Sequence, residues 1–294
     1  MRFVKVFVAV CAMGVGGCGG TTMMNSSPDM AMKPVVPPGL TLEGSMGMTP
    51  GDIACVGNPK DPAAPDAETV VTGVIKDFQD DNKVVGAVIK LYATVEDVMA
   101  NKPMVTSAPS DADGNFTYTV PKGYYRIIRA NEGGKAVSSG NMVKTIPTYE
   151  FNVVYSDKSP TAVKTSTKDL IPGLVSVTQM DGFGVLAGGA RDCNNKHVQG
   201  AIVDVAATGY KSDGQIFYFA DVPGAGTVPV RNQKWTGDNG VFAALNVPPG
   251  YGIVTIKGAL KMGDPLTVIS QYKIPVIADA VTIVEAQAGP TMAK

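Results

Sequence analysis

Residues 113–124 read DGNFTYTVPKGY, which is one β-strand with the turns at both of its ends. Threonines alternate with apolar side chains, so that one face of the strand is apolar, formed by Phe116, Tyr118 and Val120. Gly114 permits a turn with positive φ, while Pro121 and Gly123 end the strand and allow a tight reversal. The stretch therefore predicts a half-buried strand of a β-sheet.

Runs of the same kind recur along the chain, and turn residues interrupt them roughly every eight to twelve positions, as in β-sandwiches and barrels. The first expected strands are residues 69–77, 86–93, 115–120, 123–130 and 149–155. Helical periodicity is confined to residues 166–179, where Pro172 limits a helix to a turn or two. The sequence therefore predicts an all-β fold.

A second copy of this pattern follows the first in the same order. Three segments are echoed: VVGAV at 84–88 by VQGAI at 198–202, DGNF at 113–116 by NGVF at 239–242, and VPKGY at 120–124 by VPPGY at 247–251. An insertion at 211–234 accounts for the longer spacing in the second copy. An ordered repeat of this length predicts two β-sandwich domains in tandem.

The Gly-Ala strand, the Asp-x-Asp-Gly-x-Phe turn and the Val-Pro-x-Gly-Tyr strand resemble the carboxypeptidase regulatory-like domain. The resemblance covers residues 67–155 well and residues 182–288 less well. It implies a small transthyretin-like (prealbumin-like), Ig-like β-sandwich in each copy. That family provides accessory modules of peptidases, adhesins, transporters and surface lipoproteins, so the resemblance implies a fold and leaves the function open.

Residues 1–17 have the parts of a secretory signal peptide, with Arg2 and Lys5 before an apolar run that ends at Val15. The run is too short for a membrane span, which needs about twenty apolar residues. Residues 15–18, Val-Gly-Gly-Cys, resemble the lipobox of bacterial lipoproteins, although that family usually has Leu where Val15 stands. The resemblance implies a mature chain that begins at Cys18 and carries acyl chains such as palmitate.

The residues after Cys18 bear on the location of the protein. Gly19 and Gly20 stand where enteric-type bacteria place the Asp that retains lipoproteins in the inner membrane. The resemblance therefore implies a protein exported by the general pathway and anchored in the outer membrane or at the cell surface. A freely secreted product of an ordinary signal peptide is the alternative.

Residues 18–66 are rich in Gly, Pro, Ser, Thr and Met and show no apolar periodicity, which predicts a flexible, disordered tether. Spaced thioethers can bind Cu(I), and the tether holds Met23, Met24, Met30, Met32, Met46 and Met48. A low-complexity tether without copper is the simpler interpretation. The expected order is signal peptide 1–17, tether 18–66, first sandwich 67–155, linker with a possible short helix 156–181, second sandwich 182–288 and tail 289–294.

The cysteines suggest one disulfide. Cys11 leaves with the signal peptide and Cys18 carries lipid, so Cys55 and Cys193 remain in the folded part. A pair of cysteines in an oxidising compartment favours a bond between them. Such a bond would tie the end of the tether to the first loop of the second domain.

Composition argues against several function classes. The net charge of −1 provides no basic field for nucleic acid. His197 is the sole histidine, so neither a zinc peptidase site nor the histidine-rich site of transthyretin-like hydrolases is expected, and no Gly-x-Ser-x-Gly elbow accompanies it. Asp111 and Asp113 could begin a calcium loop, but Pro109 stands where a further acidic ligand is needed, which favours a plain turn. We expect no enzyme activity, catalytic residue, metal or cofactor.

The expected function is that of a cell-envelope lipoprotein that serves as a non-catalytic structural or protein-interaction module. Its partners would be the membrane, through the lipid anchor, and an envelope protein, peptide or glycan. The alternative is a surface adhesin that binds carbohydrate or peptide through exposed aromatic rings in or beside the insertion: Tyr210, Phe217, Tyr218, Phe219 and Trp235. Against this, residues 216–219 could form an additional buried strand.

Overall fold

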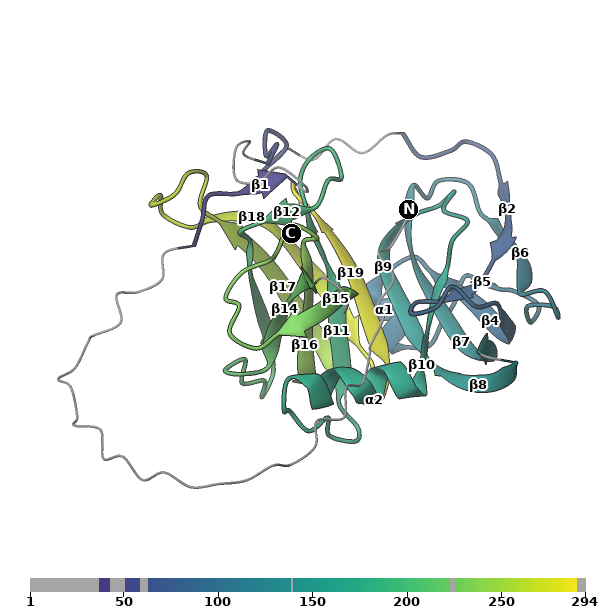
Figure 1. Ribbon diagram of the computed structural model, residues 1–294. Helices are drawn as coiled ribbons and strands as arrows, with labels where there is room; N and C mark the ends of the chain where they lie inside the picture. Colours follow the sequence, from purple (N-terminus) through teal and green to yellow (C-terminus); the bar gives the residue numbers. More distant parts are fainter. Residues whose placement is uncertain (1–36, 43–50, 59–62, 139, 223–225, 290–294) are drawn as a thin grey trace, which may run out of the picture.

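The computed structural model describes residues 37–42, 51–58, 63–138, 140–222 and 226–289 (Figure 1). Nearly all regular structure in these residues is β-strand. The two helices in this described part are α1 (Val95–Met99) and α2 (Thr165–Leu174). The prediction of an all-β fold is therefore confirmed.

The first unit, residues 69–154, packs two sheets face to face. The smaller sheet pairs β2 (Thr69–Val74) with β6 (Asn115–Val120) in antiparallel register. The larger sheet is built on five strands: β4 (Val84–Tyr92), β5 (Val105–Thr106), β7 (Arg126–Ser138), β8 (Asn141–Ile146) and β9 (Thr148–Val154). The inward side chains of β6 are those that the alternation predicts, and each is at most 4% exposed: Phe116, Tyr118 and Val120.

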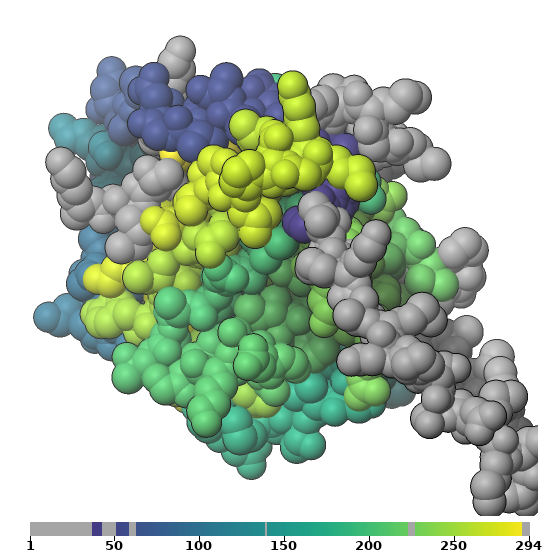
Figure 2. Space-filling view, turned by 90° about the vertical axis from the view of Figure 1, so that its left-hand side faces the viewer, coloured from purple at the N-terminus to yellow at the C-terminus, as the bar shows by residue number. Residues whose placement is uncertain are grey.

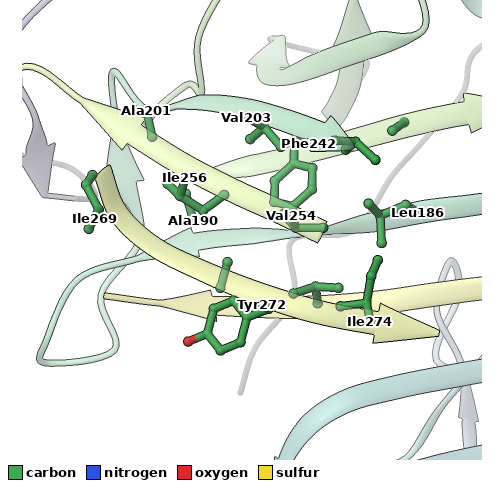
Figure 3. Packing of buried hydrophobic residues seen from close by; sticks show 14 of the residues in the cluster. Leu186, Ala190, Ala201, Val203, Phe242, Val254, Ile256, Ile269, Tyr272 and Ile274 are labelled. Atoms are coloured by element: carbon green, nitrogen blue, oxygen red, sulfur yellow. The ribbon is translucent and has the colours of Figure 1, made fainter. Parts of the chain in front are cut away.

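The second unit, residues 184–287, follows the same plan with an additional hairpin. One sheet contains β13 (Ile202–Ala207), β17 (Gly250–Gly258) and β18 (Thr267–Val276). The facing sheet contains β11 (Gly184–Arg191), β14 (Ile216–Val222), β15 (Gly226–Val230) and β16 (Val241–Val247). Figure 3 shows the core between them, where the ring of Phe242 lies close to Val203 and Val254.

Parallel strand pairing joins the two units into one continuous sheet. The last strand, β19 (Val281–Gln287), pairs with β11 of the second unit on one side and with β9 of the first on the other. The resulting twelve-stranded sheet extends to two further strands of the linker and the first unit, β10 (Thr161–Lys164) and β3 (Lys76–Asp77). The sequence gives no local indication of this join.

Apolar clusters cover both faces of the join. On one face Tyr149 of β9 packs with Tyr92, Val95 and Val98 around α1. On the other face Val281 of β19 belongs to a cluster with Ile146, Val163, Val175, Val185, Phe217 and Leu245. Side chains from both units contribute to each cluster, so the two sandwiches form a single packed body.

The helix expected within residues 166–179 forms as α2. At ten residues it is longer than the expected turn or two. The reason is the position of Pro172 in its last turn, where a missing backbone N–H interrupts few hydrogen bonds. Neither α1 nor α2, among the described residues, is long and apolar enough to cross a bilayer.

Part of the segment that the sequence suggests is a tether packs on the second unit. Thr41–Leu42 form β1 and pair with β12 (Val198–Gln199). Leu40 is 2% exposed and belongs to the core of the second unit. The expected signal peptide, Cys18 and the six methionines considered for copper lie outside the described residues.

Candidate functional site

The predicted disulfide between Cys55 and Cys193 is present, with Cα atoms 5.8 Å apart. Hydrogen bonds hold the two loops that carry it against each other. The backbone N–H of Cys193 donates to the carbonyl of Asp52 at 2.7 Å, and the carboxylate of Asp192 accepts from the backbone N–H of Asp52. The disulfide thus fastens residues 51–58 to the second unit.

The aromatic residues considered as a ligand face are not assembled on the surface. Phe217, Tyr218 and Phe219 are 5%, 5% and 8% exposed, because β14 is an interior strand with apolar clusters on both sides. Tyr210 and Trp235 are half-buried. Three of the five rings are therefore too buried for a ligand to stack on them. Residues 216–219 instead form the additional buried strand that is the alternative to a ligand face.

Tyr218 uses its polar atom inside the protein. Its hydroxyl accepts a hydrogen bond of 2.9 Å from the backbone N–H of Val203, at the edge of the opposite sheet. Burial raises the pKa of Tyr218 to about 12. The side chain therefore links the two layers of the second unit.

A pair of equivalent hydroxyl residues, which the sequence comparison did not find, holds the same bend in both units. In the first unit the Ser110 hydroxyl donates to the carbonyl of Val84 at 2.8 Å and accepts from the N–H of Ala87 at 3.0 Å. In the second unit Thr236 makes the same two bonds with its hydroxyl, at 2.6 Å to the carbonyl of Val198 and 2.9 Å from the N–H of Ala201. A shared position four residues before the turn glycine of each copy is the signal that could have revealed them.

The turn glycines of the repeat serve the fold. Gly114 has a φ of 74° and Gly240 a φ of 66°, in the left-handed region that favours glycine. A Cβ at Gly240 would lie 2.8 Å from the carbonyl oxygen of Ala190, and one at Gly114 would lie 3.2 Å from that of Ile75. The repeated motif is therefore a requirement of the backbone at this turn.

The acidic residues considered for calcium are engaged within their own turn. The Asp111 carboxylate accepts from the backbone N–H groups of Asp113 and Asn115, both at 2.8 Å, and from the Asn115 amide at 2.9 Å. These bonds from Asn115 hold the pKa of Asp111 below its ordinary value. Asp113 pairs with Lys83 at 2.6 Å.

His197 of the second copy occupies the position of Lys83 in the first copy. Its backbone forms an isolated antiparallel β-bridge with Arg191. Within the described ranges, no group of three or more His, Cys, Asp or Glu residues is arranged to hold a metal ion.

Two buried ionic clusters in the first unit and its linker were not anticipated. The fully buried Arg129 guanidinium contacts the Glu150 carboxylate at 2.6 Å and the backbone carbonyl of Asp157 at 2.9 Å. Burial opposes the charge of Arg129, but Glu150, Tyr118 and Asp157 together outweigh burial and raise the pKa of the guanidinium. The guanidinium of Arg129 therefore remains charged inside the sandwich.

The second cluster lies at the edge where β10 meets β3. The Lys164 ammonium contacts the carboxylates of Asp80 at 2.6 Å and Asp77 at 3.3 Å. Burial raises the pKa of Asp77. Burial acts in the same direction on Asp80, but hydrogen bonds from Lys164 and Ser138 outweigh it and hold the pKa of Asp80 at about 2. These contacts fix the linker to the first unit.

A shallow hollow of about 450 Å³ lies on the outer face of the β13–β17–β18 sheet. Its lining is Ala206, Ala207, Thr208, Tyr251, Ile253 and Lys273. The Lys273 ammonium lies 4.3 Å from the centre of the Tyr251 ring and also pairs with Glu96 of the first unit. Neither buried ionic cluster reaches this hollow, so their carboxylates are not placed to act on a ligand there.

Comparison with known proteins gives no family. No family model matches the chain, and no curated protein matches it. Solved structures that match include the shaft pilin spaA of Lactobacillus rhamnosus GG, at 10% identity, with a TM-score of 0.22, over 77% of this chain and 100% of that one.

Two further matches are a Streptococcal ancillary pilin and GBS52, the minor pilin of Streptococcus agalactiae. The first is 20% identical with a TM-score of 0.21, over 76% of this chain and 63% of that chain. The second is 12% identical with a TM-score of 0.19, over 76% of this chain and 98% of that chain. Scores of this size establish no shared fold, so the role of this chain is argued from its own residues.

Proposed function

We propose that this protein is a cell-envelope lipoprotein whose folded part is a non-catalytic structural or protein-interaction module. It is exported, acylated at Cys18 and held in the outer membrane or at the cell surface. Its two units are carboxypeptidase regulatory-like sandwiches. Its partner, besides the membrane, is an envelope protein, peptide or glycan.

The disulfide between Cys55 and Cys193 is the observation that carries this proposal. Disulfides of this kind persist in oxidising compartments outside the cytoplasm, which agrees with the export signal. The bond also fastens the segment that follows the proposed anchor to a rigid body, as a module that is displayed on a membrane requires.

A structural role is supported by the use of the polar residues. The ionic groups of Arg129 and Lys164 tie strands together, the hydroxyls of Ser110 and Thr236 hold backbone bends, and the Asp111 carboxylate closes a turn. Each of these groups, all candidates for chemistry by residue type, is occupied by a contact that the fold needs.

Metabolic labelling with a clickable fatty acid, followed by membrane fractionation, tests the anchor. We expect the Cys18→Ala variant to lose both the label and membrane association. The matched control is Cys11→Ala, which changes the cysteine of the signal peptide and should retain both. A Cys18→Ala protein that is still labelled would refute acylation at this residue.

A further inference from the structure

Three exposed apolar side chains lie together in the loop between β17 and β18, residues 259–266. Leu260 is 38% exposed, Met262 80% and Leu266 45%. They make up a third of the large hydrophobic side chains that are exposed in the described part of the chain, although the loop is only eight residues long. Apolar side chains gathered in this way mark a contact surface more often than scattered ones do.

The N-terminal segment enters the fold beside this loop. The backbone N–H of Leu40 donates to the carbonyl of Ala259 at 2.8 Å, and Gly39 forms a parallel bridge with Ala259. A Cβ at Gly39 would lie 3.0 Å from the backbone nitrogen of Met262. Figure 2 shows the yellow-green atoms of this part of the chain against the purple atoms of the N-terminal segment.

The position of the segment limits the distance between the loop and the proposed anchor. Between Cys18 and Pro37 the chain spans at most about 70 Å even if it is fully extended. The segment then reaches the folded body at the loop itself. The loop thus lies at the point where the chain that leads from Cys18 first packs on the second unit.

The loop has the composition of a membrane-interface contact. Lys261 lies between Leu260 and Met262, where its ammonium can remain at the headgroups while its apolar stem follows the neighbouring side chains. The Asp264 carboxylate accepts a hydrogen bond from the backbone N–H of Lys261, which closes the loop on itself. The apolar tip therefore projects from a compact turn.

We propose that the 259–266 loop inserts its apolar side chains into the headgroup layer of the bilayer that holds the acyl anchor. This second contact sets the orientation of the module. The second unit lies against the membrane and the first unit points away, because Lys273, which pairs with Glu96 of the first unit, lies in the half of β18 that is remote from the loop. The proposal rests on the acylation proposed above.

A depth measurement on the acylated full-length protein in phosphatidylcholine–phosphatidylglycerol vesicles tests the insertion. An environment-sensitive fluorophore is attached to the thiol of Met262→Cys. Cys55 and Cys193 do not react with it, because they are bonded to each other. We expect a blue-shifted emission that nitroxide-bearing lipids quench at least twofold. The matched control is Met142→Cys, 49% exposed in β8 of the first unit, which should emit as in water and remain unquenched.

Unquenched emission from position 262 on acylated protein would overturn the proposal and leave the loop to a protein partner. A second preparation separates this outcome from failure of acylation. The mature chain from residue 18, with Cys18→Ser, is held on nickel-chelating lipid by an N-terminal hexahistidine tag, so that the loop is presented without an acyl chain. Quenching at position 262 is expected there too, and replacing Leu260 and Leu266 by Ser in this tagged chain should lower the quenching at least twofold.

Discussion

The ion pair between Arg129 and Glu150 shows how differently the two copies fill one position. Aligning VPKGY with VPPGY places Arg129 of the first unit where the second has Ile256, which is 1% exposed in its core. Both side chains point into the interior of their sandwich. The periodicity of the sequence identifies such an inward position but does not show that one copy fills it with a charged residue. The first unit pairs the buried charge of Arg129 with Glu150, whereas the second unit has an uncharged side chain at the same position.

Removing one member of this pair should destabilise the protein strongly. We expect Glu150→Ala to lower the free energy of unfolding by about 3–5 kcal/mol, because the Arg129 charge then lacks its closest carboxylate. The double variant Arg129→Ile with Glu150→Val should recover most of that loss. Urea unfolding measures both effects. The control is Asp113→Ala, which removes an exposed ion pair and should lower the free energy of unfolding by less than about 1 kcal/mol. Equal effects of Glu150→Ala and Asp113→Ala would contradict the argument.

The hydroxyls of Ser110 and Thr236 should each be worth more than an exposed hydroxyl. Thr236→Val leaves the buried N–H of Ala201 and the carbonyl of Val198 without their hydroxyl partner, at a cost of about 2 kcal/mol in unfolding free energy. Ser110→Ala should act in the same way in the first unit. Thr117→Val, on the exposed face of β6, is the matched control and should change stability by less than about 0.5 kcal/mol. A loss no larger than that of the control would show that water replaces the hydroxyl.

The Asp80–Lys164 contact should make stability fall in acid. The pKa of Asp80 is about 2 when folded, below its ordinary 3.8, so its stabilisation is present above about pH 4 and is lost as the pH falls towards 2. The side chain is a third exposed, so solvent screening reduces the effect to about 1 kcal/mol. Asp80→Asn should flatten this part of the pH–stability curve. Asn82→Ala, which removes an amide contact with Ser138 but no carboxylate, should leave it steep.

At the scale of elements, the strands that sequence reasoning found are those with local signals. The strand at 115–120 was predicted at its exact bounds because alternation and its flanking turns specify it. The aromatic stretch at Phe217 was ambiguous, since a strand buried on both faces has no alternation to distinguish it from an exposed one. The pairing of β19 with β9, and of β1 with β12, joins segments far apart in sequence, for which no local pattern exists.

The join between the units should make them unfold together. Tyr149 and Val281 lie in the apolar clusters on its two faces, so we expect the variant with both Tyr149→Ser and Val281→Ser to divide one calorimetric transition into two. Phe116→Ser, inside the core of the first unit alone, should lower the transition temperature without dividing it when the join is intact. A single transition in the double variant would mean that the strand pairing couples the units without these side chains.

At the scale of the whole molecule, the disulfide decides which unit carries force. Cys55 and Cys193 are 138 residues apart, and the loop that they close contains the entire first unit. A pull between the N-terminus and the C-terminus therefore passes through the two sulfur atoms and enters the second unit at Cys193. The first unit is excluded from the stretched path.

Stretching single molecules between their termini tests this path. The oxidised protein should release only the chain outside the disulfide loop, which includes the second unit from residue 194 onward but not β11. The Cys55→Ser/Cys193→Ser variant should release about 480 Å more, the length of the loop when it is fully extended. The matched control is the oxidised protein pulled from a handle at Thr117 in the first unit to the C-terminus, where the disulfide no longer shields that unit and additional extension should appear. If the oxidised protein pulled from its termini already gave the full extension, the first unit would lie within the loaded chain, and the bond would have another role.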